Sequence, residues 1–440
     1  MRKTRLIMKK RLTALSLAAS VAVLTGCTGS GAGAGTGTKS FSAEYGKTVP
    51  ERYETIKSDE AERKALDSSA ENLRNFAVES SAKIFPDVEG NYLYSPASLY
   101  MALQLCGGLT AEGKADDLIS LLGATDREDL RKQGNALIRS LSSDEKGEIL
   151  KIGNSIWMDT VQLPTISSDA QKVITDTAAP LGADIYHEKL TDPKTKDQIN
   201  SWIASRTENM ITEMPVEPDP STAMILFNTL YFDKKWKDTY SEDQVVKSDF
   251  YPGGGKESVT IDRLEFIEKY NSYVQTEHAV SSAVEYQDGS YMILIKPNSQ
   301  EDFEAAMTED LKEIIKAYAE ESFTKPDGPY EVLFGIPLVD YSCKMDSLGN
   351  TIKDMGVGSV FQSGAFSDID RSLYVSEIAQ DCRIIVDREG TKAAAVTEIL
   401  MTKGAISQII DLRMDRDYGY VIMSEDDIPL FIGAVRDPKL

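Results

Sequence analysis

The stretch REGTKAAAVTEILMTKGA, from Arg388 to Ala405, is rich in alanine and has no turn residue between Gly390 and Gly404. As a helix it is acceptable, because alanine is the best helix former. As a strand, the part from Gly390 to Thr402 divides into two faces, with both of its charges, Lys392 and Glu398, on one face and small residues on the other. That small face comprises Thr391, Ala393, Ala395 and Thr397. Such a strand could slip between neighbours that are already packed, because no large side chain must be forced past them. A surface helix and an inserting strand both remain open from this stretch alone.

Composition and charge restrict the partners. The chain has 440 residues, of which 41% are hydrophobic and 27% charged, as in an ordinary globular protein. Its formal net charge is −22. Phosphate binding needs clustered Lys and Arg that such an acidic field opposes, so we expect no nucleic-acid partner.

The N-terminus has the layout of an export signal. Basic residues precede an apolar run from Leu12 to Leu24, which is too short to span a membrane as a helix. The run ends in Leu24-Thr25-Gly26-Cys27, which resembles the bacterial lipobox, whose cysteine carries the lipid. Several acyl chains on Cys27 would hold the protein firmly at a membrane. We therefore expect an exported protein, lipid-anchored on the extracellular face of a bacterial membrane.

Three segments follow from this pattern. Residues 1–26 are predicted to be a lipoprotein signal peptide. Residues 27–67 begin with a run of Gly, Ala, Ser and Thr and continue charged and weakly patterned, which predicts a flexible stalk. Residues 68–440 are predicted to be the folded domain.

The sequence offers little to an enzyme. His187 and His278 are the only histidines, and neither lies in an H-E-x-x-H zinc motif. No G-x-S-x-G nucleophile elbow occurs in the sequence. Apart from Cys27 the cysteines are Cys106, Cys343 and Cys382, scattered in apolar surroundings, so buried thiols are expected rather than disulfides. We predict no catalytic residue, no metal and no cofactor.

Helical patterns dominate early and strand patterns late. Residues Leu73 to Ile84 have helical spacing, and a second apolar stretch, Leu99 to Leu105, is entered through Ser95-Pro96. The predicted strands are Ile152–Trp157, Ala223–Phe232, Tyr291–Lys296, Val332–Val339, Cys382–Val386 and Tyr420–Met423. This order favours an α+β fold with a large sheet covered by helices.

Five motifs in order resemble those of the serpins, protease inhibitors with a mobile reactive loop. They are Asn91-Tyr92-Leu93-Tyr94-Ser95-Pro96-Ala97-Ser98, Ile199-Asn200-Ser201-Trp202, Asn228-Thr229-Leu230-Tyr231-Phe232 with Trp236, Gly390 to Thr397, and Leu430-Phe431-Ile432-Gly433 with Pro438. The resemblance implies the serpin fold: a large mixed main sheet with helices packed on it, further sheets and an exposed reactive loop.

The resemblance also implies a mechanism. A protease attacks the loop as a substrate, and the cleaved loop then inserts into the main sheet as an extra strand. The hinge of the loop would be Gly390, Thr391, Ala393, Ala394, Ala395 and Thr397. The region where the sheet opens would comprise Ser95, Ser98, Asn228, Trp236, Gln380 and Arg388.

Two positions depart from the family pattern. Arg388 stands where a glutamate usually begins the hinge, and Gln380 stands in place of a histidine at the sheet opening. Glutamine keeps a donor and an acceptor but does not titrate near neutral pH.

The scissile bond is expected within the window Thr402, Lys403, Gly404 and Ala405. A small residue there suits elastase-like or subtilisin-like pockets, which are favoured, and Lys403 suits a trypsin-like pocket. The leading hypothesis is thus a monomeric, lipid-tethered suicide inhibitor of serine proteases, with cysteine proteases as a second target class. One alternative is a non-inhibitory serpin that serves as a protease substrate or binding scaffold. Another is a surface solute-binding or adhesive lipoprotein.

Overall fold

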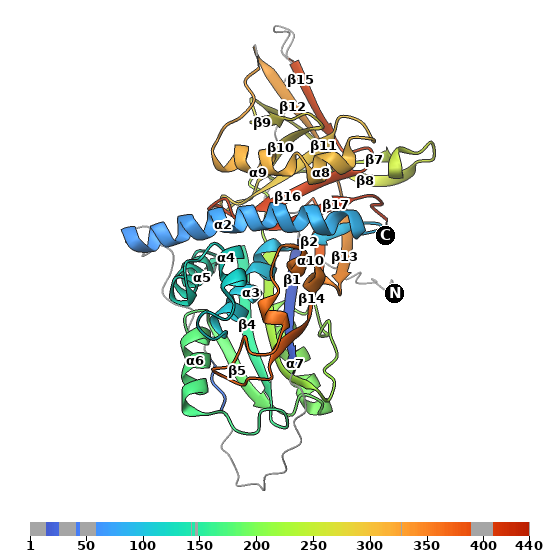
Figure 1. The fold of residues 1–440 in the computed structure, drawn as a ribbon. Coiled ribbons are helices and arrows are strands. Elements are labelled where there is room, and N and C mark those ends of the chain that lie inside the picture. The colour runs from blue at the N-terminus through green and yellow to red at the C-terminus, as the bar shows by residue number, and fades with distance from the viewer. Residues whose placement is uncertain are drawn as a thin grey trace, which may run out of the picture.

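The main sheet fills one half of the molecule (Figure 1). The computed structural model describes residues 15–25, 41–44, 59–141, 143–145, 148–326, 328–388 and 408–439. The sheet has seven strands, six of them in the order β13-β14-β1-β6-β4-β3, with β5 on β4. The strands are β1 (Leu15–Thr25), β3 (Ser143–Glu145), β4 (Glu148–Asp159), β5 (Ala183–Glu188), β6 (Thr222–Asp233), β13 (Val339–Met345) and β14 (Tyr374–Val386).

Strand β1 lies between β14 and β6 and is antiparallel to both. Its register runs from Leu15, opposite Ile385 and Asp233, to Thr25, opposite Tyr374 and Thr222. β14 and β6 therefore run parallel to each other, with a full strand position between them. This segment belongs to the predicted signal peptide, for which the sequence reasoning expected no place in the sheet.

Two smaller sheets form the other half of the molecule (Figure 1). The six-stranded sheet has the order β2-β17-β16-β11-β10-β9, and the four-stranded sheet β15-β12-β8-β7. The first comprises β2 (Tyr92–Tyr94), β9 (Tyr273–Gln275), β10 (Ala279–Glu285), β11 (Tyr291–Pro297), β16 (Tyr418–Met423) and β17 (Pro429–Val435). The second comprises β7 (Val245–Phe250), β8 (Val259–Lys269), β12 (Tyr330–Pro337) and β15 (Gln408–Arg413).

Helix α2 (Glu60–Ile84) crosses the molecule between these two halves (Figure 1). It begins at the cap Asp59, whose carboxylate accepts from the backbone N–H groups of Ala61 and Glu62. Leu66 in its second turn is buried. The stalk boundary predicted at residue 67 is therefore wrong at this end: residues 60–67 belong to the folded helix. The charged residues that suggested a stalk lie on its solvent side.

Helix α3 (Pro96–Gly108) lies beneath the main sheet, and all of its residues are buried. Ser95 caps its first turn, and Pro96 occupies the first helical position, where its missing N–H costs nothing. The other helices are α4 (Asp116–Leu121), α5 (Arg127–Leu141), α6 (Ser168–Ala178), α7 (Pro193–Arg206), α8 (Phe303–Thr308), α9 (Leu311–Ala319) and α10 (Leu348–Asp354).

The strand predictions are confirmed with one exception. The apolar run Val332–Val339 is not one strand, because the chain leaves β12 at Pro337 and enters β13 at Val339, in a different sheet. Continuous hydrophobicity could not reveal this break, since both pieces are buried. The prediction that Cys106, Cys343 and Cys382 are buried free thiols is confirmed.

Candidate functional site: the opening of the main sheet

Gln380 fastens strand β14 to the start of helix α3. Its side-chain oxygen accepts from the Ser95 N–H at 2.9 Å, and its side-chain nitrogen donates to the Ser95 carbonyl at 3.0 Å. The Ser95 hydroxyl in turn donates to the carbonyl of Leu430 at 2.7 Å. Gln380 is fully buried, so both ends of its amide must be paired, and both are. The neutral amide of Gln380 thus supplies both a donor and an acceptor at the position where the family pattern has a histidine.

Asn228 fastens strand β6 to the same helix. The Ser98 hydroxyl donates to its side-chain oxygen at 2.6 Å, and its side-chain nitrogen donates to Asn154 on β4 at 2.8 Å. Asn154 then donates to the carbonyl of Leu181 at 2.8 Å. This chain of hydrogen bonds connects α3 to β6 and β4.

Gln380 and Asn228 lie at the same level on either side of β1. Both have Ser20 as their backbone register partner in that strand. The two serines of α3 therefore hold the two walls of one strand position, Ser95 through β14 and Ser98 through β6. The structure brings Ser95, Ser98, Asn228 and Gln380 together, and the opening of the sheet at this level stays a prediction.

Two members of this cluster were missed. The Cys382 thiol lies 3.2 Å from the Gln380 side-chain oxygen, and burial raises the pKa of Cys382 well above its usual value, so it remains a donor. The period of two in a strand could have placed Cys382 on the face of Gln380. Asn154 could not have been found this way, because only strand pairing brings it beside Asn228.

Trp236 holds the end of β14. Its indole N–H donates to the carbonyl of Asp387 at 3.1 Å, and its ring stacks on Tyr286 with centroids 4.5 Å apart. Both rings are buried. Trp236 thus fixes the point at which the chain leaves the sheet, some distance along the strand from the Gln380 and Asn228 level.

Arg388 lies at the base of the predicted loop and contacts the half of the molecule that contains the two smaller sheets. Its guanidinium donates to the carbonyl of Tyr240 at 2.8 Å and lies 4.0 Å from the Glu242 carboxylate. The Glu242 side chain is 86% exposed, so water screens this ion pair. A glutamate at this position would need a cationic partner. Arg388 instead contacts a carbonyl, that of Tyr240, and an acid, Glu242.

The loop itself lies outside the described residues. This applies to the predicted hinge residues Gly390, Thr391, Ala393, Ala394, Ala395 and Thr397, to the scissile window Thr402, Lys403, Gly404 and Ala405, and to Cys27. What the structure gives are its two attachments. β14 ends at Val386 beside the filled strand position, and β15 begins at Gln408 in the four-stranded sheet.

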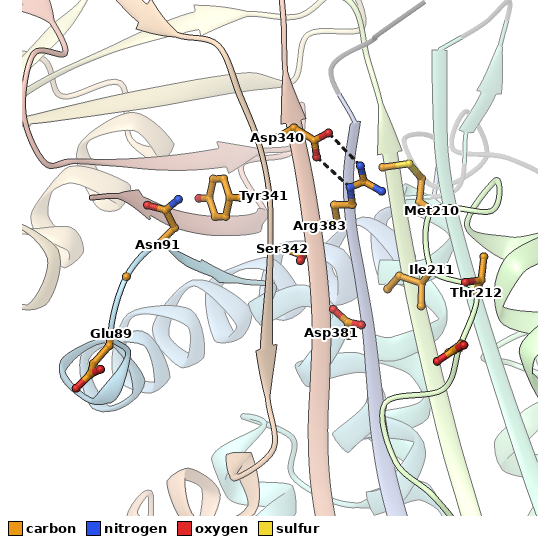
Figure 2. A pocket seen from close by; sticks show the side chains of 12 residues that line it. Glu89, Asn91, Met210, Ile211, Thr212, Asp340, Tyr341, Ser342, Asp381 and Arg383 are labelled. Atoms are coloured by element: carbon orange, nitrogen blue, oxygen red, sulfur yellow. Dashed lines mark hydrogen bonds and ion pairs between the residues drawn. The ribbon is translucent and has the colours of Figure 1, made fainter. Parts of the chain in front are cut away.

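A groove of about 690 Å³ lies over the outer face of the main sheet beside the strand position (Figure 2). Asp340 and Arg383 form a two-point ion pair in its wall, with both contacts at 3.0 Å, and residues 210–213 form the opposite wall. Burial raises the pKa of Asp381 in the same wall. Its lining has no histidine or cysteine, so the groove offers no nucleophile paired with a base.

The two histidines are also used structurally. His187 contacts the carbonyl of Leu163 at 3.0 Å, and His278 contacts the carboxylate of Asp310 at 2.9 Å. Within the described ranges no group of three or more His, Cys, Asp or Glu residues could hold a metal. In the same ranges no helix is long and apolar enough to cross a membrane.

An α+β fold with three sheets, whose main sheet holds a strand between two parallel neighbours, is the fold of the serpin class. The family model for serpins, serine protease inhibitors, matches residues 71–438. The chain belongs to the serpin family.

Relatives and solved structures agree with this assignment. An uncharacterized serpin-like protein of Methanosarcina mazei is 27% identical over 398 residues, covering 84% of this chain and 87% of that protein. Serpin A3-8 of Bos taurus is 25% identical over 363 residues, covering 79% and 83%. The crystal structure of tengpin, a thermophilic serpin, in its native state has a TM-score of 0.69 at 22% identity, covering 90% of this chain and 99% of that one. The family supports a function of the protease-inhibitor type.

Proposed function

We propose that this chain is a suicide inhibitor of serine proteases, with cysteine proteases as a second target class. After cleavage, its reactive loop would insert between β14 and β6. The observation that carries the proposal is β1, which pairs along its whole length with both walls of that position. The loop leaves the sheet at the end of one of these walls. Thr391 to Met401 is a stretch of the same length as β1, so the loop can fill the same position.

Backbone hydrogen bonds supply the driving force. A strand between β14 and β6 gains partners on both sides, each bond contributing roughly 0.5 to 1.5 kcal/mol net. Some ten such bonds make insertion effectively irreversible. The protease, still joined to the cleaved loop by an acyl bond, would be carried along with the inserting strand. It would be trapped before water can hydrolyse that bond.

The N-terminal segment must leave this position for the trap to work. Removal of residues 1–26 at export would free the walls, and a lipid on Cys27 would keep the protein at the extracellular face of the membrane. Cys27→Ala should then abolish acylation and membrane retention. Unchanged incorporation of labelled fatty acid in that variant would remove the tether from the proposal.

The target follows from the scissile window. Gly404 and Ala405 suit the small pockets of elastase-like and subtilisin-like proteases, and Lys403 suits a trypsin-like pocket with a carboxylate at its base. We favour the small-residue targets.

One observation favours a non-inhibitory serpin that serves as a protease substrate or binding scaffold. Arg388 donates to the Tyr240 carbonyl and so ties the base of the loop to the four-stranded-sheet half. If this contact held the loop out of the sheet, cleavage would release the protease.

Covalent trapping separates the two functions. The chain beginning at Thr28 is mixed with an elastase, a subtilisin and a trypsin, and the products are run on a denaturing gel. An inhibitor gives a band shifted by the mass of the protease, whereas a substrate gives only the nicked chain. The chain that retains residues 1–27 should be cleaved without trapping, because β1 already fills the strand position.

Two variants test the insertion step. Ala395→Arg places a charge on the face that would turn inward, where desolvation costs several kcal/mol, and should convert the inhibitor into a substrate. Ala394→Arg, on the opposite face, is the matched control and should still trap. Equal loss in both variants would contradict the alternation of faces, and trapping by Ala395→Arg would contradict insertion.

A further inference from the structure

Two of the buried cysteines lie directly opposite each other in the main sheet. Cys343 on β13 has Cys382 on β14 as its register partner in the antiparallel ladder. Both are reduced thiols in the structure, as is Cys106 on α3. Residues that face each other in a ladder project from the same side of the sheet. Strand pairing therefore brings these two thiols to one face, although they lie far apart in the sequence.

The surroundings of the two sulfur atoms agree with this placement. The Leu93 N–H interacts with the Cys343 sulfur, and the Ser95 N–H interacts with the Cys382 sulfur. These two donors lie where β2 leads into α3, beneath the sheet. Burial raises the pKa of Cys382 well above its usual value, and the nearby Cys343 adds to the rise. Both sulfur atoms therefore lie on the inner face of the sheet and close to each other.

The backbone spacing of such a pair fits a disulfide. Directly opposed residues in an antiparallel ladder have Cα atoms about 4.5 to 5.5 Å apart. A disulfide joins residues whose Cα atoms are about 4.4 to 6.8 Å apart. The Cβ atoms need to approach by about 1 Å from their usual cross-strand spacing. A small flexing of the strands can supply this, because β13 is the last strand of the sheet on its side.

We propose that Cys343 and Cys382 are joined by a cross-strand disulfide in the exported protein, and that this bond fastens β13 to β14. The proposal rests on the export that is part of the proposed function, because disulfides persist in oxidising compartments. Two thiols become one S–S bond and release two protons and two electrons. The oxidant is a disulfide of that compartment. One cysteine attacks it to give a mixed disulfide, the other cysteine displaces the mixed partner, and the oxidant leaves as two thiols.

Burial decides when the bond can form. Cys382 is fully buried and Cys343 is only 9% exposed, so an oxidant cannot reach either sulfur in the folded protein. Burial also raises the pKa of Cys343, and a thiol that stays protonated is a poor nucleophile. The bond should thus form while the newly exported chain folds, and it should afterwards resist reduction.

The bond would lie beside the Gln380 contact without crossing the strand position between β14 and β6. Oxidation removes the Cys382 thiol contact to the Gln380 side-chain oxygen, which still accepts from the Ser95 N–H. On the outer face, the ion pair between Asp340 and Arg383 already joins the same two strands (Figure 2). With a covalent link on the inner face as well, β13 and β14 would move as one unit when β14 separates from β6.

Refolding of the chain beginning at Thr28 tests the bond independently of export. The reduced, unfolded chain is refolded in a mixture of oxidised and reduced glutathione, and the free thiols are then alkylated in denaturant. We expect one alkylated thiol, Cys106, against three in the chain refolded with dithiothreitol. Digestion without reduction should yield a linked peptide pair that contains Cys343 and Cys382 and is two hydrogen atoms lighter than its parts. Three free thiols after refolding in glutathione, or a bond that includes Cys106, would overturn the proposal.

Cys343→Ala and Cys106→Ala form a matched pair. Each removes one buried sulfur, but only Cys343→Ala removes a partner of the bond. After refolding in glutathione, both remaining thiols of Cys343→Ala should be alkylated, whereas Cys106→Ala should form the bond and leave no free thiol. The reverse pattern would overturn the pairing. The comparison of oxidised and reduced unaltered chain needs no variant, so a variant that fails to fold does not prevent the test.

Thermal midpoints measure whether the bond fastens the strands. The oxidised form should have a midpoint roughly 5 to 10 °C above that of the reduced form, because the bond restricts the unfolded chain. Cys106→Ala should keep this difference, and Cys343→Ala should show none. An oxidised midpoint equal to or below the reduced one would overturn the fastening of β13 to β14.

This proposal and the proposed function fail differently. Oxidised and reduced chains should trap a protease to a similar extent, because the bond lies on one side of the strand position. If neither form traps, the inhibitory function fails, yet alkylation and midpoints still support or overturn the bond. Protein purified from the producing cells tests export. Free thiols at Cys343 and Cys382 in that protein, with the bond formed in glutathione, would overturn export and support the pairing.

Discussion

The half of the molecule built on the main sheet and the half built on the six-stranded sheet are held together differently. At the opening of the main sheet, Gln380 and Asn228 are fixed by side-chain hydrogen bonds to Ser95 and Ser98. In the six-stranded sheet, β16 and β17 are buried at every position, with mainly apolar side chains. Interlocked apolar side chains must be unpacked to separate strands, whereas a few hydrogen bonds fix each wall at one level. β6 of the main sheet is also buried at all but its last position, so the two sheets differ in the buried polar contacts at the level of Gln380 and Asn228 and not in burial itself.

Cleavage of the loop should give the largest effect, because the proposed insertion would add a strand to the main sheet. We expect nicking within Thr402–Ala405, in the chain beginning at Thr28, to raise the thermal midpoint by well over ten degrees. Several kcal/mol from a new strand correspond to this shift at roughly 2 to 4 °C per kcal/mol. Differential scanning calorimetry before and after nicking measures it. An unchanged midpoint would mean that the cleaved loop does not insert into the main sheet.

Asn228→Ala should destabilise the main sheet by about 2 to 4 kcal/mol, because Ser98 and Asn154 lose a buried partner. Ile293→Ala in β11 is the matched control, with a similar expected loss of about 2 to 5 kcal/mol from a cavity. Urea unfolding measures both. If the contacts of Asn228 hold the main sheet closed, Asn228→Ala should also lose inhibitory activity quickly during incubation, whereas Ile293→Ala should not. Equal rates of loss would erase the contrast between the two sheets.

Glu268 on β8 should make the stability of the protein depend on pH. Burial, together with the neighbouring acids Asp238 and Glu285, raises the pKa of Glu268 to about 7. The folded protein therefore holds this proton more tightly than the unfolded chain, whose glutamate titrates near 4.3. The stability it contributes is complete below that value and is lost as pH rises through 7. Because the group is partly solvated, we expect on the order of 1 to 2 kcal/mol.

Thermal unfolding between pH 5 and pH 8 checks this. Glu268→Gln should be more stable than the unaltered chain at pH 8 and should lose part of the pH dependence. Glu313→Gln, at an exposed position on α9, is the control and should follow the unaltered chain. Parallel curves for all three proteins would contradict the assignment.

Arg388→Ala should have the smallest effect, because its contacts join the two halves at a partly exposed point. Loss of the hydrogen bond to the Tyr240 carbonyl should cost about 1 kcal/mol. Arg388→Lys can keep a donor and should lose less. Trapping stoichiometry decides the role of this residue: if Arg388 restrains the loop, Arg388→Ala traps more efficiently. A loss of several kcal/mol would instead make it a structural link between the halves.

The residues at the opening could be named from the sequence, but their partners could not. The motifs around Ser95 and Asn228 predicted that these side chains lie where the sheet would open, and the structure joins Ser95 to Gln380 and Asn228 to Ser98 at one level of β1. That Gln380 pairs with both backbone groups of Ser95 depends on a strand and a helix cap whose residues are 285 positions apart along the chain. A side chain's hydrogen-bond capacity is local information, whereas the groups that satisfy it are brought near by the fold.

The sequence by itself determined the α+β class, most of the strands and the buried thiols, because periodicity and hydrophobicity record which face of an element is buried. Only the tertiary structure decided that Val332–Val339 divides between two sheets, that α2 begins at Glu60, and that Leu15–Thr25 pairs with β14 and β6. Each of these depends on what lies beside a segment. The hydrophobicity of an apolar run is the same whether it lies in a membrane, in a core or between two strands with unpaired backbone groups. Only the strand pairing distinguishes these cases.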